Sequence, residues 1–260
     1  MNNTFDIKKV LLFVVPGVVI VITIVVALMY APNLMNPVNT LEGSGNAATS
    51  EKKISNIRSI DINVPGTVKI VASDENILEM SVDDNFSDCI TITDEDRKLI
   101  INQKACNGQQ TYQFKPKAGI SITIKSPNIE RIALSSSAEI TAETKETKEF
   151  EIFHTGSGSI TSGVNTDKLN VRLSGSGKIA LTGRGFEQSI EVTGAGTFDG
   201  QNLSGNVGSV LMNSTGNVLI NTSEVLTIKG SGSGTIYYIG APSITRTISG
   251  PVKVQPYSGK

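Results

Sequence analysis

Apolar and polar residues alternate along most of the chain after residue 54, in short runs that are bounded by turn residues. Examples are RSIDINV (58–64), TVKIVAS (67–73) and ISITIKS (120–126). A period of two is typical of β-strands with one buried face. Proline and glycine at 65–66 and proline and asparagine at 127–128 fall between such runs, where turns are expected. The pattern predicts a continuous all-β unit.

A repeat begins at residue 135. Glycine- and serine-rich clusters such as SGSGKI (174–179) and TGAGTF (193–198) recur, and each cluster ends on an apolar residue. These final residues are Ile140, Ile160, Ile179, Phe198, Val218 and Ile236. Their spacings of 20, 19, 19, 20 and 18 give a period near 19, which is typical of a solenoid.

Strand-like runs between the clusters can be aligned on the same repeat. Two columns are predicted to face inward and one to face outward, because side chains alternate along a strand. The inward columns are Ile152, Val171, Ile190, Val210 and His154, Leu173, Val192, Met212; the outward column is Phe153, Arg172, Glu191, Leu211. Arg172 beside Glu191 predicts an exposed ion pair worth at most about 1 kcal/mol.

The glycines of the repeat are predicted to form the corners of successive coils. They are Gly156, Gly158, Gly175, Gly177, Gly194, Gly196, Gly216, Gly232 and Gly234. Glycine suits a corner because it accepts positive φ and lets one coil's backbone approach the next. The fold predicted is a parallel β-helix-like solenoid. A period of 19 specifies neither its handedness nor the number of strands per coil.

The predicted extracytoplasmic domain covers residues 54–256, with the repeats at 135–254. Residues 54–134 have strand patterns but no repeat, and they are expected to cap the solenoid. An uncapped end would offer an open sheet edge, which could pair copies of the chain into a homo-oligomer.

Cys89 and Cys106 are the two cysteines of the chain, and they bracket two alternating runs that read as a hairpin. The ends of a hairpin lie close together. In an oxidising compartment a disulfide is therefore predicted, closing a loop of about 17 residues and contributing roughly 3 kcal/mol. The alternative is two unrelated thiols.

Residues 10–30, VLLFVVPGVVIVITIVVALMY, carry no charge. At about 1.5 Å per residue such a helix spans a bilayer core of roughly 30 Å. Lys8 and Lys9 precede it, which predicts a cytoplasmic N-terminus (1–9) and a single-pass anchor in a bacterial cytoplasmic membrane, with the domain outside. Residues 31–53 are expected to be a flexible linker. A cleaved signal peptide is the alternative.

Composition excludes several classes of function. A net charge of −1 argues against a nucleic-acid partner, and the single histidine, His154, leaves little material for a metal cluster or a serine hydrolase. His154 is expected to be partly buried with one hydrogen bond. No cofactor or metal site is predicted. The acidic residues Asp83, Asp84, Asp88, Asp94 and Asp96 are interpreted as solvated turns.

The run at 175–178, GSGK, does not fit a phosphate-binding loop. That pattern needs a glycine five residues before its Gly-Lys pair and a serine or threonine after it. Arg172 and Ile179 occupy those positions. The glycines are therefore assigned to the repeat.

The recurrent SGSG-x-[IV] motif, the run SIDINVPGTVKIV (59–71) and the closing block GSGSGTIYYIGAPSITRTISGPVKV (230–254) resemble the head GIN domain family of auto-transporter adhesins. The resemblance covers residues 57–254. It implies a bacterial cell-envelope protein with a β-helical fold and no established catalytic residues.

The sequence therefore predicts a non-enzymatic, membrane-anchored envelope protein whose β-helix binds or scaffolds an envelope protein or glycan. The alternative is a polysaccharide-binding or polysaccharide-active β-helix. A candidate contact surface consists of the outward apolar residues Phe153, Leu211, Leu219 and Tyr237. The alternative for these four is that another part of the chain covers them.

Overall fold

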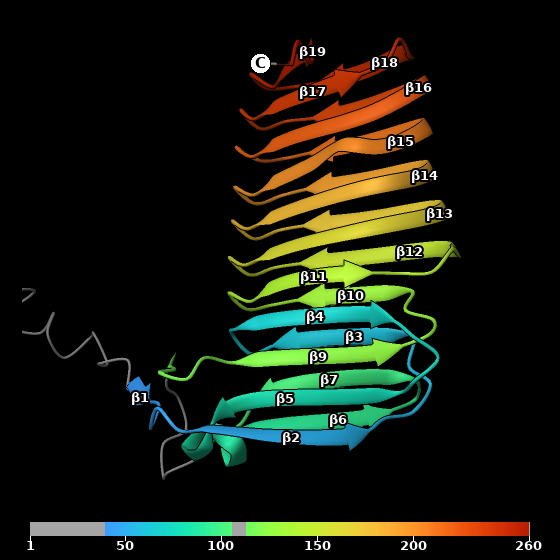
Figure 1. Ribbon diagram of the computed structural model, residues 1–260. Helices are drawn as coiled ribbons and strands as arrows, with labels where there is room; N and C mark the ends of the chain where they lie inside the picture. The colour runs from blue at the N-terminus through green and yellow to red at the C-terminus, as the bar shows by residue number, and fades with distance from the viewer. Residues whose placement is uncertain (1–39, 106–112, 260) are drawn as a thin grey trace, which may run out of the picture. The chain divides into compact units, whose positions relative to one another are not determined.

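The computed structural model describes residues 40–105 and 113–259. All of these except Thr40 and Gln113 belong to one compact unit, which is drawn as a stack of strands in Figure 1. Apart from one short 3-10 helix, η1 (Asp84–Cys89), the regular elements are strands. The strands are β1 Thr40–Glu42, β2 Ala47–Lys53, β3 Ser59–Asn63, β4 Thr67–Ala72, β5 Ile77–Asp83, β6 Ile90–Glu95, β7 Lys98–Gln103, β8 Gln113–Lys115, β9 Ser121–Ser126, β10 Arg131–Leu134, β11 Glu139–Glu143, β12 Thr147–His154, β13 Ser159–Leu173, β14 Lys178–Val192, β15 Thr197–Met212, β16 Asn217–Gly230, β17 Thr235–Ile239, β18 Ser243–Ile248 and β19 Lys253–Pro256.

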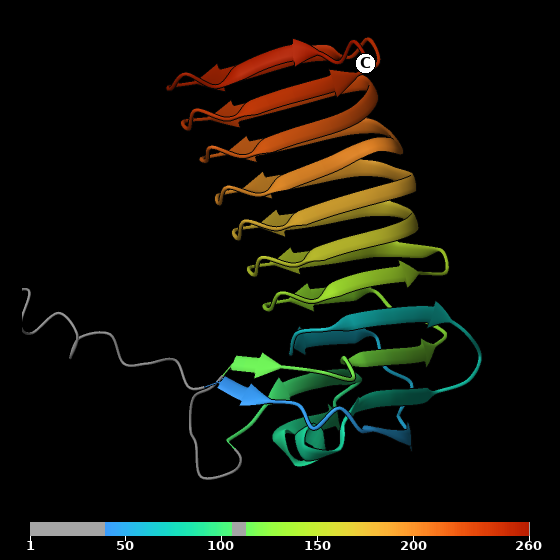
Figure 2. The same cartoon turned by 60° about the vertical axis from the view of Figure 1, so that its left-hand side comes forward.

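The predicted β-solenoid is confirmed. Strands β10 to β19 pair in parallel with the equivalent strands of the next coil, and there are about 7 turns. Each coil has two strand segments, which meet at a tight glycine-rich corner on one side and at a bend on the other; the two sides of the stack can be followed in Figures 1 and 2. In β13 to β16, which are 14 to 16 residues long, the strand continues through this bend.

The register matches the alignment predicted from the repeat. Ser159 pairs with Lys178 and Lys178 pairs with Thr197, each 19 residues further along the chain. Both inward columns are buried, and the final apolar residue of each cluster is also buried in a third column. The outward pair forms the predicted ion contact, because Arg172 Nε lies 3.3 Å from Glu191 Oε2. Apolar ladders of this kind hold the coils together by burial of side-chain surface.

Residues 54–134 do more than cap the repeats. Strands β3 and β4 form a coil that lies between β10–β11 on one side and β7 and β9 on the other, in parallel register with both. The inward columns therefore continue through Ile60 and Leu99, although these segments are not in chain order. A fixed spacing cannot appear in a sequence whose successive coils come from non-consecutive segments. Antiparallel pairing by β5 and β6 then ends the parallel stack.

The predicted linker is too long at its C-terminal end. Residues 47–53 form strand β2, which pairs antiparallel with β5 along its whole length. The pattern of AATSEKK gave no strand signal because most of its side chains are exposed on both faces. The predicted membrane-spanning segment at 10–30 lies outside the described residues. Within the described part of the chain, no helix is long and apolar enough to cross a bilayer.

The predicted hairpin around the cysteines is confirmed. β6 and β7 are antiparallel, and beyond β7 the backbone N–H of Lys104 donates to the Cys89 carbonyl across 2.9 Å. Cys89 is buried at the end of η1. Cys106 lies outside the described residues, so the predicted disulfide stays a prediction.

We expect non-reducing electrophoresis of the alkylated protein to show a faster band than reducing electrophoresis, because a closed loop makes the denatured chain more compact. Cys106→Ser should abolish the difference between the two bands. Ala105→Ser changes the neighbouring residue and is the matched control, which should retain the shift. Identical mobility of the wild-type protein under both conditions would contradict the bridge.

Candidate binding surfaces

The four residues predicted as a contact surface do not form one patch. Phe153 and Leu211 lie in one outward column, whereas Leu219 and Tyr237 are register partners in another column. Phe153 is half-buried, and the guanidinium carbons of Arg131 and Arg172 lie 4.6 and 5.4 Å from the centre of its ring. These cation–π contacts explain an outward phenylalanine without any partner.

A smaller aromatic group remains near the C-terminal coil. The ring centres of Tyr237 and Tyr257 are 6.0 Å apart in an edge-to-face arrangement. The edge strands of this coil, β18 and β19, each pair with a single strand among the described residues. In β18, Arg246 is the register partner of Ile228, and Pro251 precedes β19 while Pro256 is its last residue. A charge in an apolar column and prolines on an edge disfavour the addition of another strand.

The corner glycines are required for close approach and not for positive φ. All six glycines with positive φ among the described residues lie elsewhere, for example Gly183 at the bend. A Cβ on any of the nine predicted corner glycines would come closer than 3.0 Å to an atom of the preceding coil, usually a carbonyl oxygen. The predicted positive φ at these corners is therefore wrong, whereas the predicted close approach of one coil's backbone to the next is confirmed.

The glycine corner also carries a shallow hollow of about 540 Å³. Its lining is rich in hydroxyl groups, including those of Ser157, Ser159, Ser176 and Thr197. Lys178 borders this hollow, but its ammonium lies 3.3 Å from a carboxylate oxygen of Asp199. Lys178, the lysine of the run that looks like a phosphate-binding loop, is thus already in an ion pair with a residue of the same surface.

His154 lies fully buried in the inward column, between Leu134 and Leu173. Neither ring nitrogen has a hydrogen-bond partner among the described residues, so the single hydrogen bond predicted from the sequence is not found. Burial lowers the pKa of His154 below its ordinary value, because the charged imidazolium is poorly solvated there. The side chain behaves as a core residue with an unsatisfied polar edge.

We expect His154→Leu to raise the free energy of unfolding at pH 7.5 by about 1 kcal/mol, since it removes two unsatisfied nitrogens from the core. In the wild-type protein the unfolded state binds a proton first as the pH falls below about 6.5, so stability declines from there towards the lower folded pKa. Urea unfolding at pH 7.5 and 5.0 should show a smaller decline in the variant. Equal declines in both proteins would contradict this assignment.

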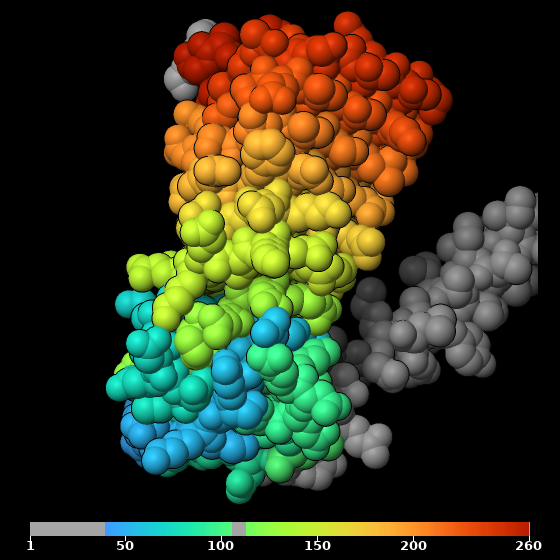
Figure 3. Space-filling model, turned by 90° about the vertical axis from the view of Figure 1, so that its right-hand side faces the viewer, coloured from blue at the N-terminus to red at the C-terminus, as the bar shows by residue number. Residues whose placement is uncertain are grey.

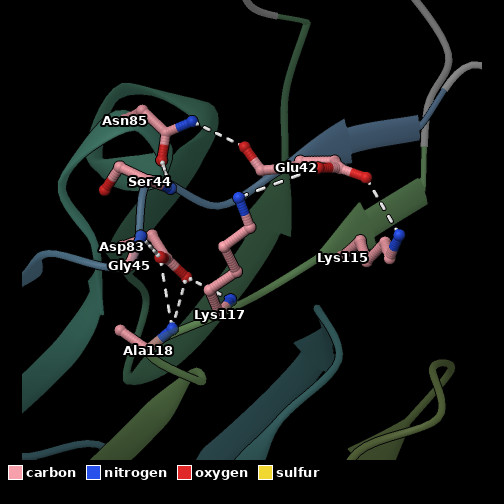
Figure 4. A network of polar contacts seen from close by, with 8 residues as sticks. All are labelled: Glu42, Ser44, Gly45, Asp83, Asn85, Lys115, Lys117 and Ala118. Carbon is pink, nitrogen blue, oxygen red and sulfur yellow. Dashed lines mark hydrogen bonds and ion pairs between the residues drawn. The ribbon is translucent and has the colours of Figure 1, made fainter.

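Asp83 is the buried centre of a polar network at the end of β5 (Figure 4). Its carboxylate accepts backbone N–H bonds from Gly45 at 2.6 Å, Lys117 at 3.0 Å and Ala118 at 3.2 Å. The interpretation of Asp83 as a solvated turn residue is therefore wrong. Burial by itself raises the pKa of Asp83, but the three backbone donors outweigh it and hold the pKa below its ordinary value.

Neighbouring contacts extend this network. Asn85 donates to the Glu42 carbonyl at 2.9 Å and accepts from the Ser44 backbone at 3.0 Å, and Lys115 donates to the Glu42 carboxylate at 2.9 Å. The bond from Lys115 lowers the pKa of Glu42. Each charged group named here has a protein partner, which makes the network a structural tie between the segment before β2 and the loop before β9.

A third surface lies on the bend side of the solenoid, which faces the viewer in Figure 3. Phe186 is 38% exposed there, beside a hollow of about 450 Å³ that is also lined by Lys148, Lys168 and Arg184. Sequence reasoning missed this surface. The signal was Phe186 itself, an aromatic residue in the polar run TGRGFEQ (182–188).

No group of three or more histidine, cysteine, aspartate or glutamate side chains is arranged to hold a metal ion within residues 40–105 and 113–259. The hollows and patches described above instead present hydroxyl groups, charged side chains of both signs and aromatic rings.

Comparison with known proteins gives one family match. A family model described as "Putative auto-transporter adhesin, head GIN domain" matches residues 56–242. No curated protein matches the sequence.

Solved structures share the fold at low sequence identity. A putative adhesin from Bacteroides fragilis has a TM-score of 0.77 and 21% identity, covering 84% of this chain and 100% of its own. A putative lipid binding protein from Parabacteroides distasonis has a TM-score of 0.67 and 19% identity, with 85% and 100% covered. A putative adhesin from Parabacteroides merdae has a TM-score of 0.63 and 17% identity, again with 85% and 100% covered.

Proposed function

Because the chain belongs to the head GIN domain family of auto-transporter adhesins, we propose that it is a non-enzymatic, membrane-anchored envelope protein whose β-solenoid binds or scaffolds a partner. The observation that carries the proposal is which groups the solenoid leaves exposed. The single histidine of the chain, His154, is buried, and the fully buried carboxylate of Asp83 is held by backbone donors, so neither presents a reactive group at the surface. Exposed groups on a rigid stack of coils suit recognition.

The uncharged run at 10–30, with Lys8 and Lys9 before it, supports a location on the outer side of a bacterial cytoplasmic membrane. The family name supports a role at the cell envelope. Two neighbours are titled putative adhesins and one a putative lipid binding protein, and these names describe those proteins. For this chain, an envelope protein or glycan is the partner that we propose.

The proposed function is tested by photo-crosslinking in the native envelope. Full-length protein carrying a photoreactive residue at position 187, on the bend side, should capture an envelope component. A matched probe at position 51 of β2, an exposed position in a strand several layers away from β14, reports background capture. Capture that is equal at both positions, or nothing beyond the protein itself, would overturn the proposal.

We expect the chain to remain in the membrane fraction after alkaline extraction and the domain to be cleaved by protease added to spheroplasts. An anchored helix resists extraction, and a domain outside the membrane is accessible to protease. Substituting Lys8 and Lys9 by glutamine should reduce this accessibility, because these residues set the orientation. A soluble chain whose N-terminus begins after residue 30 would instead support the cleaved signal peptide.

A second candidate function is polysaccharide binding. The observation that favours it is the hollow beside Phe186, where an aromatic ring, carboxylates and cations meet on one open surface. The captured partner bears on both candidates: capture of a protein alone favours scaffolding and contradicts the second candidate, whereas capture of a glycan is compatible with both.

A further inference from the structure

Exposed apolar side chains are concentrated on the bend side of the solenoid. Among the described residues, the exposed large apolar side chains are Phe186 and Val225. Half-exposed Val207 pairs with Val225 in one direction and with Glu187, next to Phe186, in the other. Figure 3 shows this side of the unit. An aromatic ring left in water is costly unless something covers it.

The fold does not require phenylalanine at this position. The register pairs on either side place Phe186 beside Asp167 in the preceding coil and beside Asn206 in the following coil. Asn206 donates to Glu224 of the next coil at 2.6 Å, so polar residues satisfy the same outward position elsewhere. Phe186 is therefore an aromatic residue in an outward column whose neighbouring members, Asp167 and Asn206, are polar.

The cations around the ring have no ion-pair partner among the described residues. Lys148, Lys168 and Arg184 line the hollow from β12, β13 and β14, and none of the three is in an ion pair within the described part of the chain. Arg172, in a neighbouring outward column, is by contrast paired with Glu191. The three charges are therefore available to a ligand with anionic groups.

Resting on the proposed binding function, we propose that this bend-side hollow binds an acidic oligosaccharide of the envelope, one whose sugar rings carry carboxylates. The exposed face of Phe186 offers a flat apolar surface to the C–H face of a sugar ring. Lys148, Lys168 and Arg184 bind its carboxylates through charge-assisted hydrogen bonds. Asp167 and Glu187 accept hydrogen bonds from sugar hydroxyls. The volume of about 450 Å³ lies in the range of small-ligand sites.

The carboxylates at the hollow decide between a sugar and a lipid surface. Asp167 and Glu187 line the same hollow as the three cations, and Glu224 lies two coils beyond. A planar anionic bilayer would meet these acidic groups together with the cations, and electrostatic attraction to anionic lipid needs an excess of basic residues. A sugar carries hydroxyls that the carboxylates can bind, so the glycan fits both charge types.

The test is titration of the full-length protein in detergent micelles with trigalacturonate, a carboxylate-bearing trisaccharide, and with neutral maltotriose. The protein carries 4-fluorophenylalanine, and the resonance that is missing in Phe186→Asn identifies the exposed ring. We expect this resonance to shift with trigalacturonate and not with maltotriose. Affinity should fall at least tenfold in Phe186→Asn and in a Lys148→Gln/Lys168→Gln/Arg184→Gln variant.

Lys229→Gln is the matched control, because Lys229 is an exposed cation in a different outward column and should change affinity less than twofold. An unshifted Phe186 resonance, or unchanged affinity in Phe186→Asn, would overturn the inference. Binding to phosphatidylglycerol vesicles in place of trigalacturonate would also overturn it in favour of a lipid surface. If the envelope crosslinking still captures a partner, the proposed function survives that failure.

Discussion

Gly175→Ala is expected to lower the free energy of unfolding by about 4 kcal/mol, the largest effect predicted for a single methyl group in this protein. A Cβ at Gly175 would lie 2.6 Å from the Thr155 carbonyl oxygen and would also overlap the carbonyl oxygen of Gly156. Both are backbone atoms of the preceding coil, so no side-chain rotation relieves the collision. The coils must separate, which weakens the hydrogen bond from Ser176 N–H to the Gly156 carbonyl at 3.2 Å.

Gly163→Ala is the control for this prediction. Gly163 lies in the same solenoid without positive φ, and its nearest contact for an added Cβ is Thr182 Oγ1 at 3.8 Å, an ordinary van der Waals distance. Alanine there should leave stability within about 1 kcal/mol of wild type, because it also reduces the entropy of the unfolded chain. Urea unfolding measures both. Similar losses in the two variants would show that close approach does not explain the corner glycines.

The coil-to-coil packing could be predicted from the sequence because each coil repeats the same constraints. Ile160, Ile179 and Phe198 stand in one column in the structure as they do in the aligned repeat. The reason predicted for the corner glycines was partly wrong, because a glycine in a sequence can reflect either a positive φ or a lack of space for a Cβ. Only the stacked backbones show which of the two applies.

The N-terminal part was less predictable for a different reason. Strands β3 and β4 join the stack between segments that come later in the chain, so their register depends on contacts far away in sequence. Asp83 was read as solvated because its three backbone donors lie 34 to 38 residues away in the chain. The candidate site at Phe186 was missed because an exposed aromatic residue can be recognised only once its neighbours in space are known.

Phe198→Ala is expected to lower the free energy of unfolding by about 3 to 5 kcal/mol, since the side chain is fully buried and the coil cannot close the cavity. The coil around Phe198 is irregular. The register between β15 and β16 passes from Asp199–Leu219 to Ser204–Asn221, so β15 has extra residues at a bulge. We infer that the phenyl ring fills the interior space that this bulge opens. Ile179→Val, in the same column of the preceding coil, should cost only about 0.5 to 1.5 kcal/mol.

Gly200 provides the sharper test of this packing, because a Cβ there would lie 2.9 Å from Phe198 Cε1 and 3.0 Å from the Leu219 carbonyl oxygen. The contact with Cε1 is lost when Phe198 is replaced by a smaller side chain. The contact with the Leu219 carbonyl oxygen is a backbone contact and remains. Gly200→Ala should therefore be less destabilising in a Phe198→Ile background than in the wild type, with a coupling energy of about 1 kcal/mol. A double-mutant cycle by urea unfolding measures this coupling. Additive effects would mean that the ring does not fill the bulge against Gly200, and that the size of Phe198 has another cause.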